Sequence, residues 1–323
     1  MRKVGVVGAG AFGTALAISV ASQNNNVILW GRSQAQMKEI KYLNENSRFL
    51  PNIKFPNELI PTSDLDALAL CEVVLLAIPT QSLREFLEAH KTKLENLPLV
   101  ACCKGAELET GDFPTEIIQR YLPRNNIMVL TGPGFAHELA QGKPTAMTLG
   151  STVPTTADFQ KILSSNTLRL YQSNDLIGLQ IGGAVKNVIA IACGIAMGAG
   201  LGESARAALM TRGFAEMIRF AKVRGGNQNT LMGLSGFGDL SLTCSSKKSR
   251  NYSYGYALSQ GDLIKYPDTV EGSETSHVIA KFGNDFDIEM PITQMVSKVI
   301  KQEISSTQAM EHLLARPLRE DES

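Results

Sequence analysis

The chain has 323 residues, of which 44% are hydrophobic, and its 31 basic residues balance 31 acidic ones. This length exceeds the usual size of one domain, so we expect two domains with substantial cores. The balanced charge gives no electrostatic reason to expect nucleic acid or an anionic membrane as the main partner. The five cysteines form no C-x-x-C pair and the four histidines lie far apart. We therefore expect no disulfide framework, no metal site and a reducing, cytoplasmic location.

Two apolar segments have alternative interpretations. Residues 4–22 follow two basic residues, as in a secretory signal, but their four glycines would each destabilise a signal helix by roughly 1 kcal/mol relative to alanine. Residues 177–202 are long enough to span a bilayer, but they contain Lys186 and seven glycines. A buried helix explains the second segment better, so we expect no membrane span.

Short apolar runs alternate with helical patterns in the first half of the chain. The runs are 4–7, 27–30, 73–78, 99–103, 127–131 and 146–149. Nearly continuous apolar runs are typical of strands buried on both faces, and the alternation predicts βαβ units in a parallel sheet. We therefore expect an α/β fold with an N-terminal doubly wound sheet of the Rossmann type.

Long helical patterns replace the strand-like runs after about residue 180. Residues 205–223, for example, repeat apolar side chains at helical spacing and end before Gly225 and Gly226, which predicts a helix stop. We place the domain boundary between residues 178 and 183. The expected domains are a dinucleotide-binding domain at 1–180 and an all-helical substrate-binding domain at 181–323, with a solvated tail at 316–323.

A glycine motif follows the first expected strand. Gly8, Gly10 and Gly13, with Ala11 and Phe12 between them, form G-x-G-x-x-G directly before a helical pattern. In this context Gly8 permits a tight turn, Gly10 lets the backbone approach a pyrophosphate, and Gly13 packs helix on strand. The motif predicts dinucleotide binding; the alternative is a glycine-rich turn that binds nothing.

The end of the second expected strand indicates which dinucleotide binds. An NAD site usually has an acidic residue here for the ribose 2′-hydroxyl, but no acid occurs before Glu39. Arg32 stands in its place and could pair with the 2′-phosphate of NADP, so NADP is favoured. The alternative is a solvated surface arginine.

Two further loops follow expected strands, where open α/β sheets bind ligands. Residues 102–107 include Lys104, which we expect to face a cleft. Gly132 and Gly134 precede a predicted helix that begins near Phe135, and backbone N–H groups in such a turn can bind an anion. A purely structural turn is the alternative for this second loop.

At this point the chain resembles a known family, the cytosolic glycerol-3-phosphate dehydrogenases that use NAD(P). The resemblance covers nearly the whole chain and rests on ordered blocks: "GAGAFGTALA", "CCKG", "TGPGFAHELA", "GGAVKNVIAIACG", "GLSGFGDLSLTC", "SRNYSYG" and "VEGSETS". The bacterial branch is the more similar one. The resemblance implies reversible reduction of dihydroxyacetone phosphate to sn-glycerol 3-phosphate for glycerophospholipid synthesis, and a homodimer. Gly134 departs from the Ser or Thr that is common there, which removes a side-chain hydroxyl contact.

Lys186 is the one charged residue in the apolar segment 180–193. With the resemblance, it becomes the group that donates a proton to the carbonyl oxygen as hydride reaches C2. Burial and a second cation, Lys104, would lower its pKa, and Gly182 and Gly183 would leave room for substrate beside Asn187. The alternative is a lysine whose stem packs in the helix while its ammonium reaches solvent.

The resemblance also implies the rest of the site. Asp239 would position Lys186, with Thr243 one helical turn beyond it, and Arg250 would clamp the substrate phosphate with two parallel hydrogen bonds. The expected cofactor contacts are Gly8, Gly10, Ala11, Phe12, Gly13, Arg32, Lys104, Ala136, Arg250 and Glu271. The expected substrate contacts are Lys104, Gly132, Gly134, Lys186, Asn187, Asp239, Ser249, Arg250 and Asn251.

Two other classes of function are open to a chain with this plan. A related Rossmann dehydrogenase could act on another small phosphorylated, hydroxy-acid or thioester substrate, and a redox sensor could keep the dinucleotide site without catalysis. Lys186 argues against the sensor. The four histidines lack the His–Glu context expected of a thioester enzyme.

Overall fold

The computed structural model describes residues 2–261 and 270–314, so the tail predicted at 316–323 lies outside the described residues. The chain forms two compact units. The sheet unit comprises Met1–Cys103 and Pro114–Leu176, and the helical unit comprises Lys104–Phe113 and Ile177–Ser323. The boundary expected between residues 180 and 181 therefore falls inside a helix that begins at Leu176, and a ten-residue loop from the first half of the chain packs with the helical unit.

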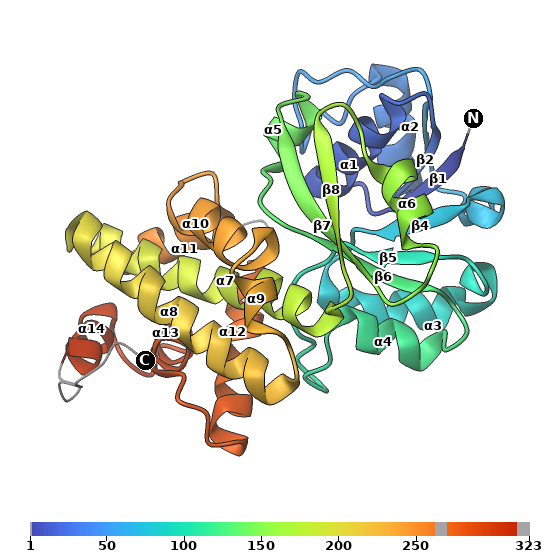
Figure 1. The fold of residues 1–323 in the computed structure, drawn as a ribbon. Coiled ribbons are helices and arrows are strands. Elements are labelled where there is room, and N and C mark those ends of the chain that lie inside the picture. The colour runs from blue at the N-terminus through green and yellow to red at the C-terminus, as the bar shows by residue number, and fades with distance from the viewer. Residues whose placement is uncertain (1, 262–269, 315–323) are drawn as a thin grey trace. The chain divides into compact units, whose positions relative to one another are not determined.

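An eight-stranded sheet forms the centre of the sheet unit (Figure 1). Its strands are β1 (Lys3–Val7), β2 (Asn26–Trp30), β3 (Leu59–Thr62), β4 (Val73–Leu76), β5 (Leu99–Ala101), β6 (Ile127–Thr131), β7 (Thr145–Ser151) and β8 (Leu168–Ser173). They lie in the order β3-β2-β1-β4-β5-β6-β7-β8. The first six follow the order of dinucleotide-binding sheets, which reverses between β1 and β4.

The predicted Rossmann-type sheet is confirmed, with two corrections. The expectation of an all-parallel sheet is wrong, because β7 runs antiparallel to β6. The helix between these two strands, α5 (Ala136–Ala140), has five residues, fewer than the roughly 10–15 residues typical of the helices that join parallel strands. Strands β3 and β8 were not predicted, because both lie at sheet edges and alternate buried with exposed residues, as at Ile60 and Tyr171.

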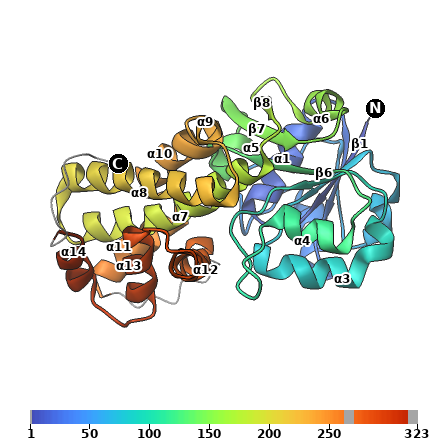
Figure 2. The same cartoon turned by 60° about the horizontal axis from the view of Figure 1, so that its bottom comes forward.

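Helices pack on the sheet. They are α1 (Ala11–Ala21), α2 (Gln34–Leu43), α3 (Leu83–Leu94), α4 (Pro114–Tyr121), α5 and α6 (Thr156–Leu163). Helices α3 and α4 lie side by side (Figure 2). Short 3-10 turns at Leu65–Leu70 and Thr80–Ser82 complete the unit.

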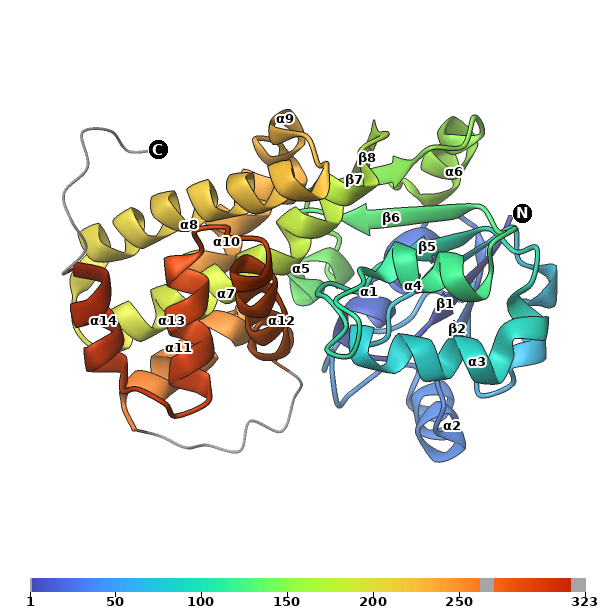
Figure 3. The ribbon, with the colours of Figure 1, turned by 90° about the horizontal axis from the view of Figure 1, so that it is seen from below.

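The described part of the helical unit contains helices and no strand. They are α7 (Leu176–Gly198), α8 (Gly202–Arg224), α9 (Gln228–Leu231), the π-turn η3 (Leu234–Gly238), α10 (Asp239–Cys244), α11 (Arg250–Ser259), α12 (Glu271–Asp285), α13 (Pro291–Ile300) and α14 (Ser306–Leu314). Figure 3 shows α13 between α12 and α14. The stop predicted after residue 223 is confirmed, because Gly225 caps α8 with a φ of 83°.

Helix α7 is the core of this unit. It is apolar and long enough to cross a membrane, but 89% of its most apolar window is buried inside the protein. Within this unit the backbone of α11 packs closely against it at Gly194. The prediction of a buried helix is confirmed, and Lys186 sits near its middle with 6% of its surface exposed.

Candidate active site

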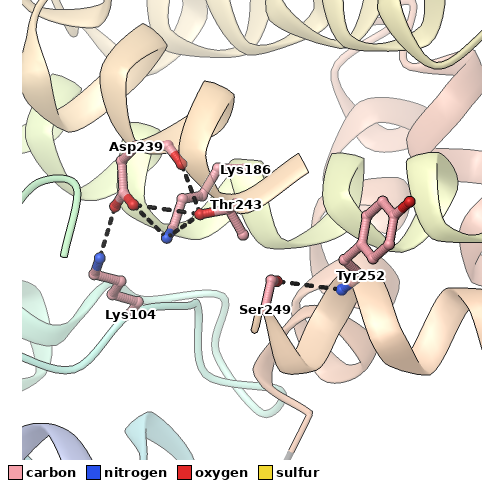
Figure 4. A network of polar contacts seen from close by, with 6 residues as sticks. All are labelled: Lys104, Lys186, Asp239, Thr243, Ser249 and Tyr252. Carbon is pink, nitrogen blue, oxygen red and sulfur yellow. Dashed lines mark hydrogen bonds and ion pairs between the residues drawn. The ribbon is translucent and has the colours of Figure 1, made fainter. Parts of the chain in front are cut away.

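Two lysines share one buried carboxylate in the helical unit. Lys186 Nζ donates a hydrogen bond to Asp239 Oδ1 at 2.6 Å, and Lys104 Nζ donates one to Asp239 Oδ2 at 2.7 Å. The exposed fractions of the three side chains are 8% for Lys186, 15% for Lys104 and 2% for Asp239. Figure 4 shows the two ammonium groups approaching the carboxylate from α7 and from the loop after β5. The three groups carry one excess positive charge, which suits an anionic ligand.

Thr243 fixes the same ammonium group from the next turn of α10. Lys186 Nζ donates to Thr243 Oγ1 at 2.8 Å, while Thr243 Oγ1 donates to the backbone oxygen of Asp239 at 2.6 Å. The spacing from Asp239 to Thr243 predicted from sequence is therefore present. Because an ammonium carries three hydrogens and Asp239 and Thr243 accept two, one remains for a substrate oxygen.

The electrostatic environment makes Lys186 able to exchange a proton near neutral pH. Burial lowers the pKa of Lys186, the charge of Lys104 adds to this effect and the carboxylate of Asp239 opposes both, which leaves the pKa at about 8. Burial alone would raise the pKa of Asp239, but the two ammonium groups outweigh it and hold that pKa below its usual value. Asp239 therefore stays ionised while Lys186 can act as acid or base.

The first turn of α11 brings three of the expected substrate residues together. Ser249 is the N-cap, and its Oγ accepts the N–H of Tyr252 at 3.2 Å (Figure 4). Arg250 is the exposed first residue of the helix. Asn251 is buried, and its Oδ1 accepts the N–H of Gly272 at 3.0 Å. Its amide oxygen is thus used to hold α12, which leaves its NH₂ group as the donor for a ligand.

Glu271 begins α12 beside this cluster. Burial raises the pKa of Glu271, and the charges of Arg250, Lys104 and Lys186 partly offset that effect. Asn187 is 3% exposed, and its backbone oxygen would lie 2.7 Å from a side-chain carbon added at Gly272. Helices α7, α11 and α12 therefore meet around the residues expected to hold substrate.

One interpretation of the sequence is wrong. Gly182 was expected to leave room for substrate, but a Cβ there would lie 2.5 Å from the backbone oxygen of Ser235. That space is filled by the η3 backbone, so Gly182 serves close packing.

The glycine motif of the sheet unit has the conformation that its sequence predicts. Gly8 has a φ of 113°, and a Cβ there would lie 2.5 Å from the backbone oxygen of Ala77. A Cβ at Gly13 would lie 2.0 Å from Gly8 O, so both positions require glycine. At Gly10, by contrast, no atom lies within 4 Å of an added Cβ, and no side chain caps α1. The loop thus leaves space open at the N-terminus of α1, beside Ala11 and Phe12, where a pyrophosphate would bind.

Sequence reasoning missed the residue that supports this loop. Asn46 is 1% exposed, and its Nδ2 donates to the backbone oxygen of Ala9 and to Thr14 Oγ1, both at 2.9 Å. It therefore ties the glycine loop to the first turns of α1. No local motif marks Asn46, because its partners lie more than thirty residues earlier in the chain.

Four other expected contacts come after the carboxyl ends of strands: Arg32 and Ala136 for the cofactor, and Gly132 and Gly134 for the substrate. Arg32 follows β2; it is exposed and has no ion pair within residues 2–261 and 270–314. Gly132 follows β6 with a φ of 148°, and its Cβ position lies 2.8 Å from Met147 Cα. At Gly134 the corresponding space holds the methyl end of Met147, at 2.5 Å. Ala136 is the first residue of α5, as expected from the helix predicted near Phe135.

Comparisons with known proteins cover both units. Residues 3–157 match the family model for the N-terminus of NAD-dependent glycerol-3-phosphate dehydrogenase, and residues 175–311 match the model for its C-terminus. A glycerol-3-phosphate dehydrogenase, NAD(P)+, of Ruegeria sp. strain TM1040 is 49% identical over 319 residues, which cover 98% of this chain and 99% of that protein.

Solved structures agree with these matches. The crystal structure of glycerol-3-phosphate dehydrogenase from Coxiella burnetii superposes with a TM-score of 0.93 at 33% identity, covering 98% of this chain and 99% of that one. A ketopantoate reductase from Ralstonia eutropha, with a TM-score of 0.63 at 14% identity, shares the fold alone. The chain therefore belongs to the family of NAD(P)-dependent glycerol-3-phosphate dehydrogenases, oxidoreductases that reduce dihydroxyacetone phosphate.

Proposed function

We propose that Lys186 is the general acid in the reduction of dihydroxyacetone phosphate and the general base in the reverse reaction. The reduced nicotinamide, when bound, would supply the hydride that reaches C2 of the substrate. Lys186 donates a proton to the carbonyl oxygen as negative charge develops on it, and is then reprotonated from solvent. The observation that carries this role is a buried ammonium held by Asp239 and Thr243 with a pKa of about 8.

Asp239 and Lys104 complete the catalytic group. Asp239 orients the Lys186 ammonium through a hydrogen bond. Its negative charge also opposes the lowering of the lysine pKa by burial. Lys104, on the second carboxylate oxygen, lowers the pKa of Lys186 and adds a positive charge that attracts a phosphorylated substrate.

The N-terminus of α11 binds the substrate phosphate. Arg250 offers a planar fork for two phosphate oxygens, and Ser249 Oγ and Asn251 Nδ2 supply neutral donors. The dipole of this ten-residue helix favours an anion at the same end. Asn187, next to Lys186, and the backbone at Gly132 and Gly134 contact the rest of the substrate.

The cofactor is NADP(H) in preference to NAD(H). Gly8, Gly10 and Gly13 bring the backbone and the N-terminus of α1 to the pyrophosphate. Arg32 pairs with the 2′-phosphate, and its exposure without an ion pair in the described ranges leaves the guanidinium available. Ala136, Glu271, Lys104 and Arg250 make the remaining cofactor contacts.

The enzyme acts as a cytoplasmic homodimer that supplies glycerophospholipid synthesis. Residues 1–180 serve as the cofactor domain and 181–323 as the substrate domain. All five cysteines are free and buried, which supports a reducing compartment.

A coupled absorbance assay with dihydroxyacetone phosphate and NADPH tests the role of Lys186. Lys186→Ala should lower kcat by about 10² to 10⁴, the usual contribution of a general acid, while NADPH binding measured by fluorescence stays unchanged. Lys222→Ala, at an exposed position of α8, is the matched control and should behave as the unmodified enzyme. Retention of more than about a tenth of kcat in Lys186→Ala would contradict the proposal.

A further inference from the structure

A π-turn immediately precedes the carboxylate that holds Lys186. Gly238 N donates to Gly233 O at 3.1 Å, five residues back, and the turn η3 continues directly into α10 at Asp239. π-helical turns are rare, and they occur mostly as single turns and frequently at functional sites. None of the η3 residues contacts substrate or cofactor in the proposed function, so their part in the enzyme needs another explanation.

The backbone of η3 touches α7 at a glycine. A Cβ added to Gly182 would lie 2.5 Å from Ser235 O and 3.2 Å from Gly236 Cα. Both atoms belong to the backbone, so no change of side-chain rotamer can make room. Gly182 lies four residues before Lys186, and Ser235 four residues before Asp239. The tight contact is therefore one turn away from the ion pair on each segment.

Two other contacts hold η3 in this position. A Cβ at Gly236 would lie 2.0 Å from Leu231 O, so the turn is pressed against α9. On α8, the ring of Phe214 meets Phe237 edge to face, with centroids 5.7 Å apart at 73°. Helices α7, α8 and α9 thus hold η3, and Asp239 follows it without a break.

We propose that Gly182 is a positioning residue, whose missing side chain lets η3 approach α7 closely enough for Asp239 to reach the Lys186 ammonium. This proposal rests on the role of Lys186 as proton donor. An alanine at 182 requires a separation of at least 3.0 Å where 2.5 Å is present, which moves Ser235, and with it Asp239, by about 0.5 Å or more. Misplacements of about 1 Å far from the reacting atoms can cost about 10²-fold in rate.

The displacement also has a consequence that loss of stability alone does not produce. The groups that face Lys186 are the carboxylate of Asp239 on α10, the ammonium of Lys104, the carboxyl of Glu271 on α12 and the thiol of Cys244 on α10. Asp239 makes the 2.6 Å contact, so its displacement weakens the charge interaction that most opposes the effect of burial on the pKa of Lys186. The protonated lysine is then less stable, and the pH dependence of the reaction shifts to lower pH.

Gly182→Ala and Gly198→Ala form a matched pair on α7. A Cβ at Gly198 would lie 2.6 Å from Tyr256 O and 1.9 Å from Ser259 Oγ, so the same substitution crowds a backbone carbonyl here too, together with one side-chain hydroxyl. Gly198 is twelve residues beyond Lys186, about 18 Å along the helix axis. The measurements are kcat and kcat/KM for dihydroxyacetone phosphate from pH 6 to 10, with the thermal midpoint Tm and the Kd for NADPH.

Gly182→Ala should lower kcat about 10²-fold and shift the basic limb of kcat to lower pH, with an unchanged Kd for NADPH. Gly198→Ala should lower Tm by a comparable amount and leave the basic limb of kcat at the same pH as in the unmodified enzyme. If Gly182→Ala loses Tm but keeps its limb and kcat within about threefold, well short of the loss that misplacement produces, the positioning role is overturned.

A second variant covers the case in which Gly182→Ala does not fold. Phe237 is 48% exposed, so Phe237→Ala should fold, and it removes the contact of η3 with α8. It should shift the basic limb in the same direction by a smaller amount; an unchanged limb overturns the proposal. Lys186→Ala separates the two hypotheses: if that variant stays active, the proton-donor role itself fails, whatever the glycine variants do.

Discussion

The carboxylate of Asp239 lies 2.6 Å from the ammonium nitrogen of Lys186, and this contact opposes what burial does to the lysine. Burial favours the neutral amine, whereas the adjacent negative charge favours the ammonium. The balance leaves the pKa of Lys186 at about 8. Reduction needs the protonated lysine and should decline above about pH 8, whereas oxidation needs the neutral amine and should decline below that pH.

Asp239→Asn should shift both declines to lower pH. The variant keeps an oxygen close to Lys186 but removes the negative charge, so the pKa of the lysine falls, by about 1 unit or more for a charge at this distance. Rates of reduction and oxidation across pH measure the effect. Asp287→Asn, an exposed position in the turn after α12, is the control for a change in net charge. If reduction and oxidation decline at the same pH in Asp239→Asn as in the unmodified enzyme, Asp239 does not set the protonation of Lys186.

Arg32→Asp should weaken the use of NADPH relative to that of NADH. The substitution removes a partner of the 2′-phosphate and introduces a charge that repels it, while an aspartate at this place can accept a hydrogen bond from the ribose 2′-hydroxyl of NAD. The ratio of kcat/KM for NADPH to that for NADH is the measurement. Arg124→Asp, at an exposed arginine before β6, makes the same change of charge near the amino end of a strand, whereas Arg32 follows the carboxyl end of β2. A ratio unchanged by Arg32→Asp would place the source of the preference elsewhere.

Asn46→Ala should weaken cofactor binding without slowing the chemical step. It leaves the Ala9 oxygen and the Thr14 hydroxyl without their buried donor, which costs about 1–3 kcal/mol and loosens the loop that carries Gly8 and Gly10. KM for NADPH should rise several-fold, with kcat at saturating cofactor nearly unchanged.

Asn125→Ala is the matched control for this change. Asn125 Nδ2 also donates to two backbone oxygens, those of Leu94 and Leu97, but it lies at the amino end of β6. Both variants should have a lower Tm, and Asn46→Ala alone should change KM for NADPH. If the two variants are equivalent in KM, Asn46 supports the fold and not the cofactor loop.

The features that sequence could predict are local in the chain. The glycine motif, the spacing from Asp239 to Thr243 and the stop at Gly225 each depend on a few consecutive residues whose conformation is strongly restricted. The six predicted strands are those buried on both faces. Strand β8 was missed because exposure of alternate residues, such as Arg169 and Tyr171, gives an edge strand little hydrophobic contrast.

Features that join distant segments could not be predicted. Gly182 is indistinguishable in sequence from a glycine that makes room for substrate, because its partner Ser235 comes 53 residues later. Nor does the sequence reveal the two hydrogen bonds that Asn46 donates, since nothing in its neighbourhood distinguishes it from other asparagines. Lys186 was the exception, because an ionisable residue in an apolar helix requires a partner wherever that partner lies.

Arg250→Lys should separate recognition of phosphate from the rest of catalysis. A lysine retains the positive charge but cannot reproduce the planar fork, so KM for dihydroxyacetone phosphate should rise strongly. Unphosphorylated dihydroxyacetone should be a very poor substrate of the unmodified enzyme, because the missing phosphate forfeits binding energy that orients the carbonyl and so lowers kcat as well.

Both substrates should be measured with both proteins, the unmodified enzyme and Arg250→Lys. Arg250→Lys should scarcely change the residual activity with dihydroxyacetone, since that substrate has no phosphate to lose contact with. If the substitution weakens both substrates equally, Arg250 does not recognise the phosphate. It would then act on the cofactor, which Kd for NADPH measures, or on the α11 N-terminus next to Ser249, which Tm measures. Either result would leave Ser249 and Asn251 as the side chains that bind the phosphate.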